Sequence, residues 1–376
     1  MNNPDVQSSK IPASALPASA DGRLTWLRLA RSSRVGPSTF IRLLRAHGTA
    51  QAALEALPHV AAEAGARGYS ACGFAEAEAE IEAAHRAGAH MLCLGAPDYP
   101  PHLALIPDPP PLLWAIGAPG LAHRPAVGLV GARNASSVGL RMARLLAEEL
   151  GAAGYMVASG LARGVDTAAH NASLATGSIA ALAGGVDTVY PRENRALWQS
   201  MAERGLLLSE APMGTAPQAR HFPRRNRIIS GVALGIVVIE GAAKSGSMIT
   251  ARNALDQGRE VMAVPGSPLD PRASGCNMLL RDGAALIRSA ADIIECLASP
   301  AQPGLPLDIS PPQPAPRPAP AAPAPGLLAL LSTTPIAEDT LIREIGLPTD
   351  KAMELIFGME LAGEITRHPG GMLSRA

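Results

Sequence analysis

The stretch GIVVIEGAAKSGSMITARNALDQGREVMAVPG, residues 235–266, contains a complete strand–loop–helix–strand unit. Its two apolar runs, GIVVI and EVMAV, are typical of buried strands, and the segment that begins near Met248 is typical of a helix. A loop of small residues, AAKSGS at 242–247, leads into this helix. Because strands joined through a helix usually lie parallel in one sheet, the unit predicts a parallel α/β fold.

The same alternation extends over much of the chain. Further apolar runs are VGLVGA, YMVASG, SIAALAG and LLLSE, and the helical segment GLRMARLLAEELGAAG lies between the first two. Near-continuous apolar strands that alternate with amphipathic helices indicate a sheet covered on both faces. The sequence therefore predicts a Rossmann-like, mostly parallel sheet with helices on both faces over residues 73–298.

Shorter segments flank this region. Residues 1–21 are polar and predict a disordered tail, whereas residues 22–72 predict short helices separated at Gly36 and Pro37. That pattern is found in SAM-like and helix-hairpin-helix modules, and a plain helical packing domain is an equal alternative. Residues 299–326 contain eleven prolines and predict a semi-rigid extended linker. Residues 327–376 predict three helices and a β wing, the order of a winged helix.

Charge is distributed unevenly along a chain whose formal net charge is zero. Residues 22–72 hold seven arginines against two glutamates, a net of +5, and residues 327–376 hold seven acids against four bases, a net of −3. Four arginines and a histidine lie within residues 220–227, with no acid among them. Any nucleic-acid surface must come from such patches, and this one indicates a chain of phosphates as ligand. An ordinary surface arginine cluster is the alternative.

The loops after the predicted strands are rich in cations, glycine and serine. Ligands of an open parallel sheet bind at the carboxyl ends of its strands. The first of these loops carries Arg133 and Ser136, the second carries Gly160 and Arg163, and the last carries Lys244 before a helix. Since backbone N–H groups and cations at a helix N-terminus suit an anion, these loops predict a phosphate-binding site.

Several enzyme chemistries lack their motif in this sequence. The loop GARNAS differs from the G-x-G-x-x-G of dinucleotide sites, and in GAAKSGS the lysine precedes the glycine, unlike a Walker A loop. Asp166 and His170 lie four residues apart, but Asp166 followed by Thr167 is more typical of a helix N-cap than of an acid–base pair. The four cysteines include no C-x-x-C pair. We therefore expect no catalytic residue, no cofactor and no metal site.

The sequence also predicts the compartment. Its first 21 residues lack the apolar core of a signal peptide. No apolar run reaches the length that spans a membrane. The expected location is the cytoplasm, with no membrane partner.

Seven sequence blocks follow one another within the predicted sheet region. They are VGARNAS (130–136), SGLARGVDTAAH (159–170), AGGVDTVYPREN (183–194), LLSEAP (207–212), FPRRNRIISG (222–231), SGSMITARNALDQGREVMAVPG (245–266) and GCNMLLRDGA (275–284). With these blocks the chain resembles the DNA processing protein A family, also called DprA or Smf. The flanking helical module and the terminal winged helix match the three-part layout of some members.

The resemblance implies a cytoplasmic single-stranded DNA-binding protein. Such a protein protects incoming DNA and loads the RecA recombinase onto it during natural transformation and recombination. The resemblance also implies a homodimer formed through the Rossmann-like region, and no turnover reaction. The DNA-binding residues expected from the matching motifs are Gly131, Arg133, Ser136, Gly160, Arg163, Arg225, Asn226, Arg227, Lys244, Ser245, Gly246 and Ser247.

Two other functions compete with this interpretation. One is a Rossmann-like nucleotide-sugar (nucleoside monophosphate) hydrolase, but where that class carries P-G-G-x-G-T-x-x-E the chain reads EGAAKSGS. The other is a transcriptional regulator that acts through the winged helix. Its presumed recognition helix, TDKAMELIFGMEL, carries Lys351 against Glu354 and Glu360, which is poor chemistry for a major groove. Incubation with nucleoside monophosphates would separate a hydrolase from a binding protein.

Overall fold

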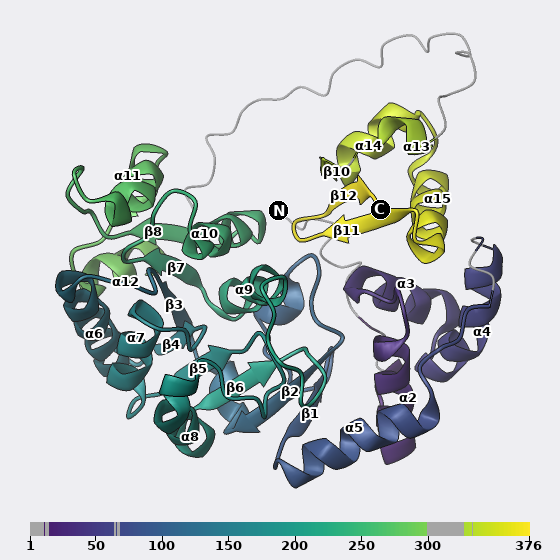
Figure 1. The fold of residues 1–376 in the computed structure, drawn as a ribbon, viewed down its shortest axis with the longest axis horizontal. Coiled ribbons are helices and arrows are strands. Elements are labelled where there is room, and N and C mark those ends of the chain that lie inside the picture. Colours follow the sequence, from purple (N-terminus) through teal and green to yellow (C-terminus); the bar gives the residue numbers. More distant parts are fainter. Residues whose placement is uncertain (1–10, 12–14, 64, 66–67, 299–326, 333) are drawn as a thin grey trace.

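The computed structural model describes residue 11, residues 15–63, residue 65, and residues 68–298, 327–332 and 334–376. Three parts follow one another along the chain: N-terminal helices, a large sheet with its helices, and a winged helix (Figure 1). In Figure 1 the N-terminal helices (purple) and the winged helix (yellow) lie next to each other on one side of the large sheet. The proline-rich segment 299–326, expected to be an extended linker, lies outside the described residues.

The N-terminal part consists of the helices α2 (Ala20–Arg31), α3 (Pro37–His47), α4 (Ala50–Glu63) and α5 (Phe74–Arg86). The expected break is present, with Gly36 as the N-cap of α3 and Pro37 as its first residue. The expected tail over residues 1–21 is too long by several residues, because Ser19 caps α2 and Ala15 is buried. Residues 1–10 and 12–14 of that tail lie outside the described part of the chain.

The large sheet has nine strands in the order β1-β2-β6-β5-β4-β3-β7-β8-β9. Every neighbouring pair from β6 to β9 is parallel, whereas β1 and β2 add an antiparallel edge beside β6. The expectation of a mostly parallel sheet is therefore confirmed. The strands are β1 (His90–Cys93), β2 (Leu112–Gly117), β3 (Ala126–Val130), β4 (Met156–Ser159), β5 (Ser178–Ala181), β6 (Leu206–Ser209), β7 (Gly235–Val238), β8 (Glu260–Ala263) and β9 (Ala285–Leu286).

The direction of strand addition reverses at β3. Strands β4, β5 and β6 lie on one side of β3, and β7, β8 and β9 lie on the other. An open α/β sheet binds its ligands at such a switch point, beyond the carboxyl ends of the strands. The loop after β3, which contains Arg133, and the loop after β7, which contains Lys244, therefore start from the same edge of the sheet.

Helices cover both faces of the sheet, as expected. On β7, Ile236 and Val238 belong to the apolar cluster that contains α9 and α10, whereas Val237 belongs to the cluster that contains α6, α7 and α12. Alternate residues of one strand are thus buried on opposite faces. The helices are α6 (Ser137–Ala152), α7 (Val165–Ser173), α8 (Arg195–Arg204), α9 (His221–Val232), α10 (Gly246–Asp256), α11 (Ser274–Arg281) and α12 (Ala290–Ala298), with short 3-10 turns η2 (Leu103–Leu105), η3 (Pro119–His123), η4 (Arg192–Asn194) and η5 (Pro271–Ala273).

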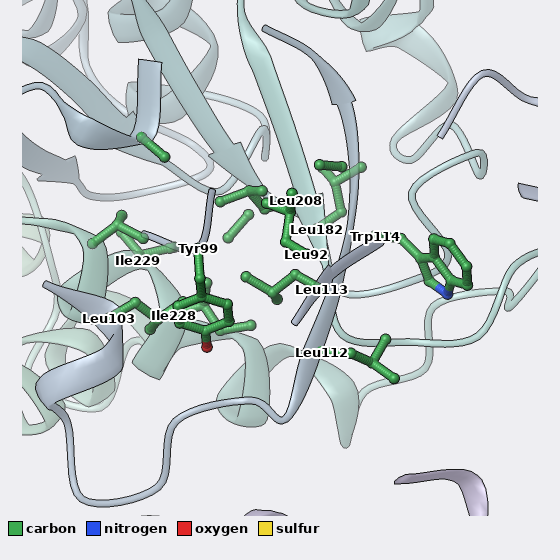
Figure 2. Packing of buried hydrophobic residues seen from close by; sticks show 14 of the residues in the cluster. Leu92, Tyr99, Leu103, Leu112, Leu113, Trp114, Leu182, Leu208, Ile228 and Ile229 are labelled. Atoms are coloured by element: carbon green, nitrogen blue, oxygen red, sulfur yellow. The ribbon is translucent and has the colours of Figure 1, made fainter. Parts of the chain in front are cut away.

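One continuous apolar core joins the N-terminal helices to the sheet. Figure 2 shows Leu92, Leu113 and Leu208, from the neighbouring strands β1, β2 and β6, within this core. Trp26 of α2 belongs to the same cluster, and its indole N–H donates to the carbonyl of Pro111 at 2.9 Å. The N-terminal helices therefore share buried surface with the sheet and are held against it.

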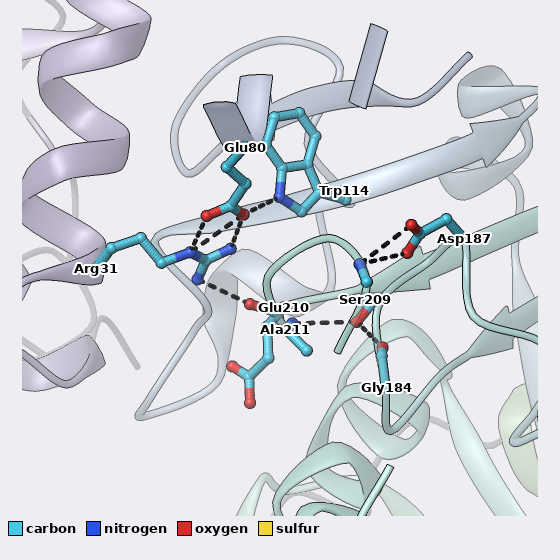
Figure 3. A network of polar contacts seen from close by, with 9 residues as sticks. Arg31, Glu80, Trp114, Gly184, Asp187, Ser209, Glu210 and Ala211 are labelled. Carbon is cyan, nitrogen blue, oxygen red and sulfur yellow. Dashed lines mark hydrogen bonds and ion pairs between the residues drawn. The ribbon is translucent and has the colours of Figure 1, made fainter. Parts of the chain in front are cut away.

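A polar network fixes the same boundary. The Arg31 guanidinium of α2 donates to the Glu80 carboxylate at 2.7 Å and to the backbone carbonyl of Glu210 at 3.0 Å (Figure 3). The indole N–H of Trp114 donates to the same Glu80 carboxylate at 2.6 Å. Arg31 thus links α2, α5 and the end of β6, and its charge is balanced within the fold.

The winged helix has a core of its own. Its elements are α13 (Leu327–Leu330), β10 (Ile336–Ala337), α14 (Glu338–Ile345), α15 (Thr349–Ala362), β11 (Ile365–His368) and β12 (Met372–Arg375), with strand order β10-β12-β11. Leu341, Ile356 and Leu373 are completely buried in its small apolar cluster. Among the described helices of the whole chain, none is both long enough and apolar enough to cross a bilayer.

Candidate nucleic-acid interface

A cavity of about 410 Å³ opens at the switch point of the sheet. Its walls come from the loops after β3, β4 and β7 and from one side of α9. The topology therefore gathers residues that are more than 100 positions apart in the sequence. Seven of the twelve expected site residues line the cavity: Gly131, Arg133, Arg225, Asn226, Ser245, Gly246 and Ser247.

Arg225 forms a buried wall of the cavity, because α9 carries it inward. Its guanidinium donates to the carbonyls of Gly160, at 2.7 Å, and Ala181. Burial lowers the pKa of Arg225 to about 10, and the nearby Asp166 carboxylate opposes that shift. The Arg225 side chain is thus a fixed, desolvated cation, and several of its N–H groups already bind the protein.

The N-terminus of α10 forms a second wall. Ser245 is the N-cap, and its side chain makes no capping hydrogen bond; its hydroxyl lies 2.7 Å from the hydroxyl of Ser247. The Asn226 side-chain amide donates to the carbonyl of Gly246 at 3.2 Å, which fixes this turn against α9. N–H groups in the first turn of a helix have no intrahelical acceptor, so they can bind an anion.

The cavity also has an aromatic wall. The guanidinium carbon of Arg133 lies 4.8 Å from the centre of the Phe222 ring, and the Tyr190 ring lies 5.5 Å from Phe222. Arg133 is exposed, in contrast to Arg225. A cation stacked on an aromatic ring presents both a charge for phosphate and a flat surface for a base.

Hydrogen bonds hold the loop after β4 in a conformation that includes a left-handed residue. Leu161 adopts a left-handed backbone with φ of 55°, which is unusual for a residue other than glycine. The Asp166 carboxylate accepts from the N–H groups of Gly160 and Ala162, at 3.1 and 3.3 Å, and Asn194 donates to the Leu161 carbonyl at 2.9 Å. The predicted role of Asp166 as a helix N-cap is wrong, because Gly164 is the N-cap of α7.

His170 supports the same loop from inside the fold. The ring is completely buried, and its Nε2 accepts from the Leu161 N–H at 3.3 Å while its Nδ1 lies 2.7 Å from the Ser178 hydroxyl. Burial, and to a lesser degree the charge of Arg225, lower the pKa of His170 to about 3. His170 is therefore a neutral, buried residue that supports this loop.

Glu240 occupies a position that sequence reasoning assigned to a ligand. Its carboxylate accepts from the backbone N–H of Ser136 at 2.8 Å and from the Ser136 hydroxyl. The Ser136 side chain is the N-cap of α6 and accepts from the Gly139 N–H. The N-terminus of α6, expected to face the ligand, is therefore already neutralised by a carboxylate of the protein.

Four further expected residues have other surroundings. Gly160 is buried against the Arg225 guanidinium, and a Cβ there would clash with a guanidinium nitrogen. Arg163 is exposed and pairs with Glu193 at 3.5 Å, while Lys244 is exposed on the loop before α10. Arg227 is buried on another side of α9. Of the twelve expected residues, Ser136, Gly160, Arg163, Arg227 and Lys244 are not part of the cavity wall.

The buried Arg227 is paired with two acids. It contacts the Glu210 carboxylate and lies 3.2 Å from the Asp108 carboxylate. Glu210 directly follows β6, so a strand-end carboxylate neutralises Arg227. Asp166 and Phe222 line the cavity but were absent from the expected set. Phe222 could be expected from the sequence as one of the few aromatic residues near the arginine-rich block, because aromatic residues make up only 3% of the chain.

We expect the replacement His170→Gln to flatten the pH dependence of stability. The wild-type pKa of His170 is lower when folded than when unfolded, so the unfolded chain binds the extra proton between about pH 6.5 and about pH 3. Its stabilising contribution is full above pH 6.5, and falls by up to about 1.4 kcal/mol per pH unit below it. Urea unfolding at about pH 7.5 and about pH 5 measures this difference.

The effect of His170 is obtained from the difference between the pH–stability profiles of wild type and the His170→Gln variant. Asp166, whose pKa burial raises, titrates in the opposite sense but is present in both proteins. Subtracting the two pH profiles therefore isolates the histidine. Parallel profiles would mean that the His170 ring takes up a proton as readily in the fold as in water.

Family models match all three parts of the chain. The model for DNA recombination-mediator protein A matches residues 90–298, the DprA-like N-terminal HHH domain matches residues 20–83, and the DprA winged helix domain matches residues 311–371. The first of these covers more than half of the chain and contains the whole cavity.

Curated relatives and solved structures agree with these matches. The chain is 38% identical to Protein Smf of Escherichia coli over 289 residues, covering 75% of this chain and 76% of that protein. It is 46% identical to DNA processing protein DprA of Bacillus subtilis over 211 residues, covering 55% and 71%. The DprA structure from Streptococcus pneumoniae aligns with a TM-score of 0.60 at 31% identity, covering 74% of this chain and 98% of that one.

A second solved structure that aligns with this chain is described for its binding of single-stranded DNA. DNA processing protein A from Helicobacter pylori, described for its single-stranded DNA binding mode, aligns with a TM-score of 0.52 at 28% identity. The alignment covers 56% of this chain and 97% of that one.

Proposed function

Since the chain belongs to the DNA recombination-mediator protein A family, we propose that it binds single-stranded DNA and has a DNA processing role in genetic transformation. The observation that carries this proposal is the cavity at the switch point, where Arg133, Arg225 and the N-terminus of α10 meet. The single-stranded DNA binding mode described for the Helicobacter pylori relative supports the same ligand.

The surroundings of the cavity suit a flexible strand. The N-terminus of α10 and the exposed Arg133 provide positive potential for phosphates, and the Phe222 ring provides a surface on which a base can stack. A single strand can bend its backbone into a cavity and turn a base toward the ring, which a rigid duplex cannot do without losing base pairs. Of the twelve residues expected from the motifs, the seven that line the cavity remain the proposed DNA contacts, together with the exposed Arg163 and Lys244. Ser136, Gly160 and Arg227 are engaged within the protein itself.

We also propose that the protein binds DNA without turning it over. The Glu240 carboxylate accepts two hydrogen bonds from Ser136, and the Asp166 carboxylate accepts two backbone N–H groups. Carboxylates engaged in this way are poorly placed to act as nucleophiles or general bases. These contacts weigh against the nucleotide-sugar hydrolase, and release of free base from nucleoside monophosphates would support that rival.

The partners are part of the proposal. We propose a homodimer through the sheet region, loading of RecA onto the bound strand and a cytoplasmic location, and family membership supports each of these. Light scattering of the intact protein would measure its oligomeric state.

We expect single-stranded DNA to bind more tightly than duplex of the same length, and Arg133→Ala to weaken that binding by roughly 1–3 kcal/mol, the value of a charge-assisted hydrogen bond. The salt dependence should also decrease by about 0.7 in log–log slope, the single-strand value for one lost phosphate contact. Fluorescence anisotropy with labelled oligonucleotides over a salt series measures both quantities.

Arg144→Ala is the matched control. Arg144 is also an exposed arginine, on α6, and lies outside the cavity wall. Its replacement should leave affinity and slope unchanged. Equal affinity for duplex and single strand would contradict the proposed ligand, and equal slopes for the two variants would place Arg133 outside the DNA contact.

A further inference from the structure

The helix that a winged helix would present to a DNA groove is packed against the rest of this protein. In helix-turn-helix folds the second helix of the motif is the one that enters the major groove. Here that helix is α15, and Figure 1 shows it beside α3 and α4. One face of α15 contributes Ala352 and Ile356 to the winged-helix core. The opposite side contributes Leu361, completely buried, and Phe357 to the main core of the protein.

Two arginines hold α15 in this position: Arg34, in the turn between α2 and α3, and Arg42 of α3. Arg42 donates to the carbonyl of Met353 at 2.9 Å, and its guanidinium carbon lies 4.2 Å from the centre of the Phe357 ring. Arg34 donates to the carbonyl of Leu361, in the last turn of α15. A cation in the last turn of a helix is favoured by the helix dipole. Residues 353, 357 and 361 are spaced by four, so these contacts follow a single face of α15.

The docked winged helix forms one wall of a second cavity. This cavity has a volume of about 800 Å³ and lies between α9, the N-terminal helices and the wing formed by β11 and β12. His221 and Arg224 line it from α9, and Arg367 and His368 line it from the wing. The buried Arg225 lines both this cavity and the smaller one at the switch point. The two cavities therefore adjoin at α9, and the larger one lies beside the proposed DNA site.

The wing itself offers little free positive charge at this place. Arg367 is paired with Glu338 at 2.7 Å and with Glu360 at 3.4 Å, and its side chain is mostly buried. A strand that extends from the switch point past the N-terminus of α9 would thus meet a wing whose arginine is already neutralised. The wing occupies space that further nucleotides would need, and its Arg367 is not free to bind them.

From this arrangement we infer that the winged helix is a docked cover: Arg34 and Arg42 hold α15, and the wing restricts a long single strand on the α9 side of the site. This inference rests on the proposed function for its ligand. A strand confined to the switch-point cavity is compatible with the docked state, whereas a longer strand favours release of the winged helix. Because coupling of this kind is reciprocal, release of the winged helix must strengthen binding of long strands.

The test uses the full-length protein with a donor and an acceptor fluorophore at positions 55 and 351. Glu55 of α4 and Lys351 of α15 are both exposed, and energy transfer between them reports docking. The double variant Arg34→Ala/Arg42→Ala should lower the docked fraction by roughly tenfold or more, since it removes two charge-assisted hydrogen bonds and a cation–π contact. Arg45→Ala, an exposed arginine on the same helix α3, is the control and should preserve energy transfer.

Binding is measured with oligothymidylates of about 6 and about 30 nucleotides, bracketing the site sizes of single-strand binding folds. The double variant should bind the long oligonucleotide at least threefold more tightly than wild type and the short one equally. In wild type, the long oligonucleotide should reduce energy transfer, and the short one should leave it unchanged. Phe357→Ala removes the aromatic partner from α15, outside the winged-helix core, and should reproduce both effects if the arginine variant is poorly folded.

Three results would overturn the inference. Energy transfer that is unchanged in both variants would show that these contacts do not hold α15. Reduced energy transfer with unchanged affinity for the long strand would show that the winged helix docks but does not restrict binding of the strand. If neither oligonucleotide binds any of the proteins, the proposed function fails and the cover fails with it, while the energy transfer still reports docking separately.

Discussion

Replacing Arg225 by alanine is expected to lower the free energy of unfolding by about 3–5 kcal/mol, because two buried carbonyls each lose a donor at a cost of about 1–3 kcal/mol and a nearby buried carboxylate loses a compensating charge. The Arg225 guanidinium is desolvated between the carbonyls of Gly160 and Ala181, opposite the buried Asp166 carboxylate. Without it both carbonyls lose a donor and Asp166 loses its neutralising charge. Urea unfolding of the variant measures the loss.

The same replacement is expected to weaken single-strand binding more than tenfold, even at temperatures where the variant is folded. Arg225 shapes the cavity wall and positions the loop that contains Gly160. From the sequence, Arg225 was expected only as a DNA-binding cation of the patch at residues 220–227. Its location on α9, 5% exposed, changes that expectation.

Two comparisons separate stability from binding. Arg133→Ala, at an exposed position on the same cavity, should reduce affinity at unchanged stability. Arg225→Lys keeps a charge but cannot reach both carbonyls as a guanidinium does, so its stability should lie between wild type and the alanine variant. Wild-type stability of Arg225→Ala would show that the contacts to Gly160 and Ala181 contribute little to the fold.

Arg227→Ala is the second replacement with a large expected effect, again about 3–5 kcal/mol of unfolding free energy. Its side chain is 3% exposed and contacts the carboxylates of Asp108 and Glu210. Burial acts to lower the pKa of Arg227, but the two carboxylates outweigh it and the pKa is raised. Removing the arginine would leave two partly buried acids facing each other. Thermal and urea unfolding measure the effect.

Arg224→Ala is a close control for this prediction. Arg224 pairs with the same Glu210 carboxylate, at 2.8 Å, but its side chain is 60% exposed. Exposed pairs contribute about 0–1 kcal/mol, so the Arg224 variant should be nearly as stable as wild type. If both variants lose equal stability, burial of the Arg227 pair is not what stabilises it. If Arg227→Ala is stable but no longer binds DNA, the residue belongs to the interface, as the motif suggested.

Most of the fold could be predicted from the sequence, because its signals are local. The alternation of apolar runs and helices along residues 127–266 requires a covered parallel sheet, and the nine-stranded sheet has this character. Gly36 and Pro37 predicted the start of α3 for a similarly local reason. The site was predicted only in part: strand ends marked the correct edge of the sheet, and seven of the twelve expected residues line the cavity there.

The sequence by itself determined the order of the elements, the edge of the sheet that carries the site and the residue types available there. Tertiary structure decided which of those charges are free. The sequence does not distinguish Arg133, Arg225 and Arg227. In the structure Arg133 is exposed, Arg225 is buried against backbone carbonyls, and Arg227 is paired with Asp108 and Glu210. Glu240 fills the N-terminus of α6, and α15 packs against α3 and α4, through contacts between residues about 100 to 300 positions apart. Periodicity and spacing describe neighbours along the chain, whereas desolvation and ion pairing depend on partners that only folding brings together.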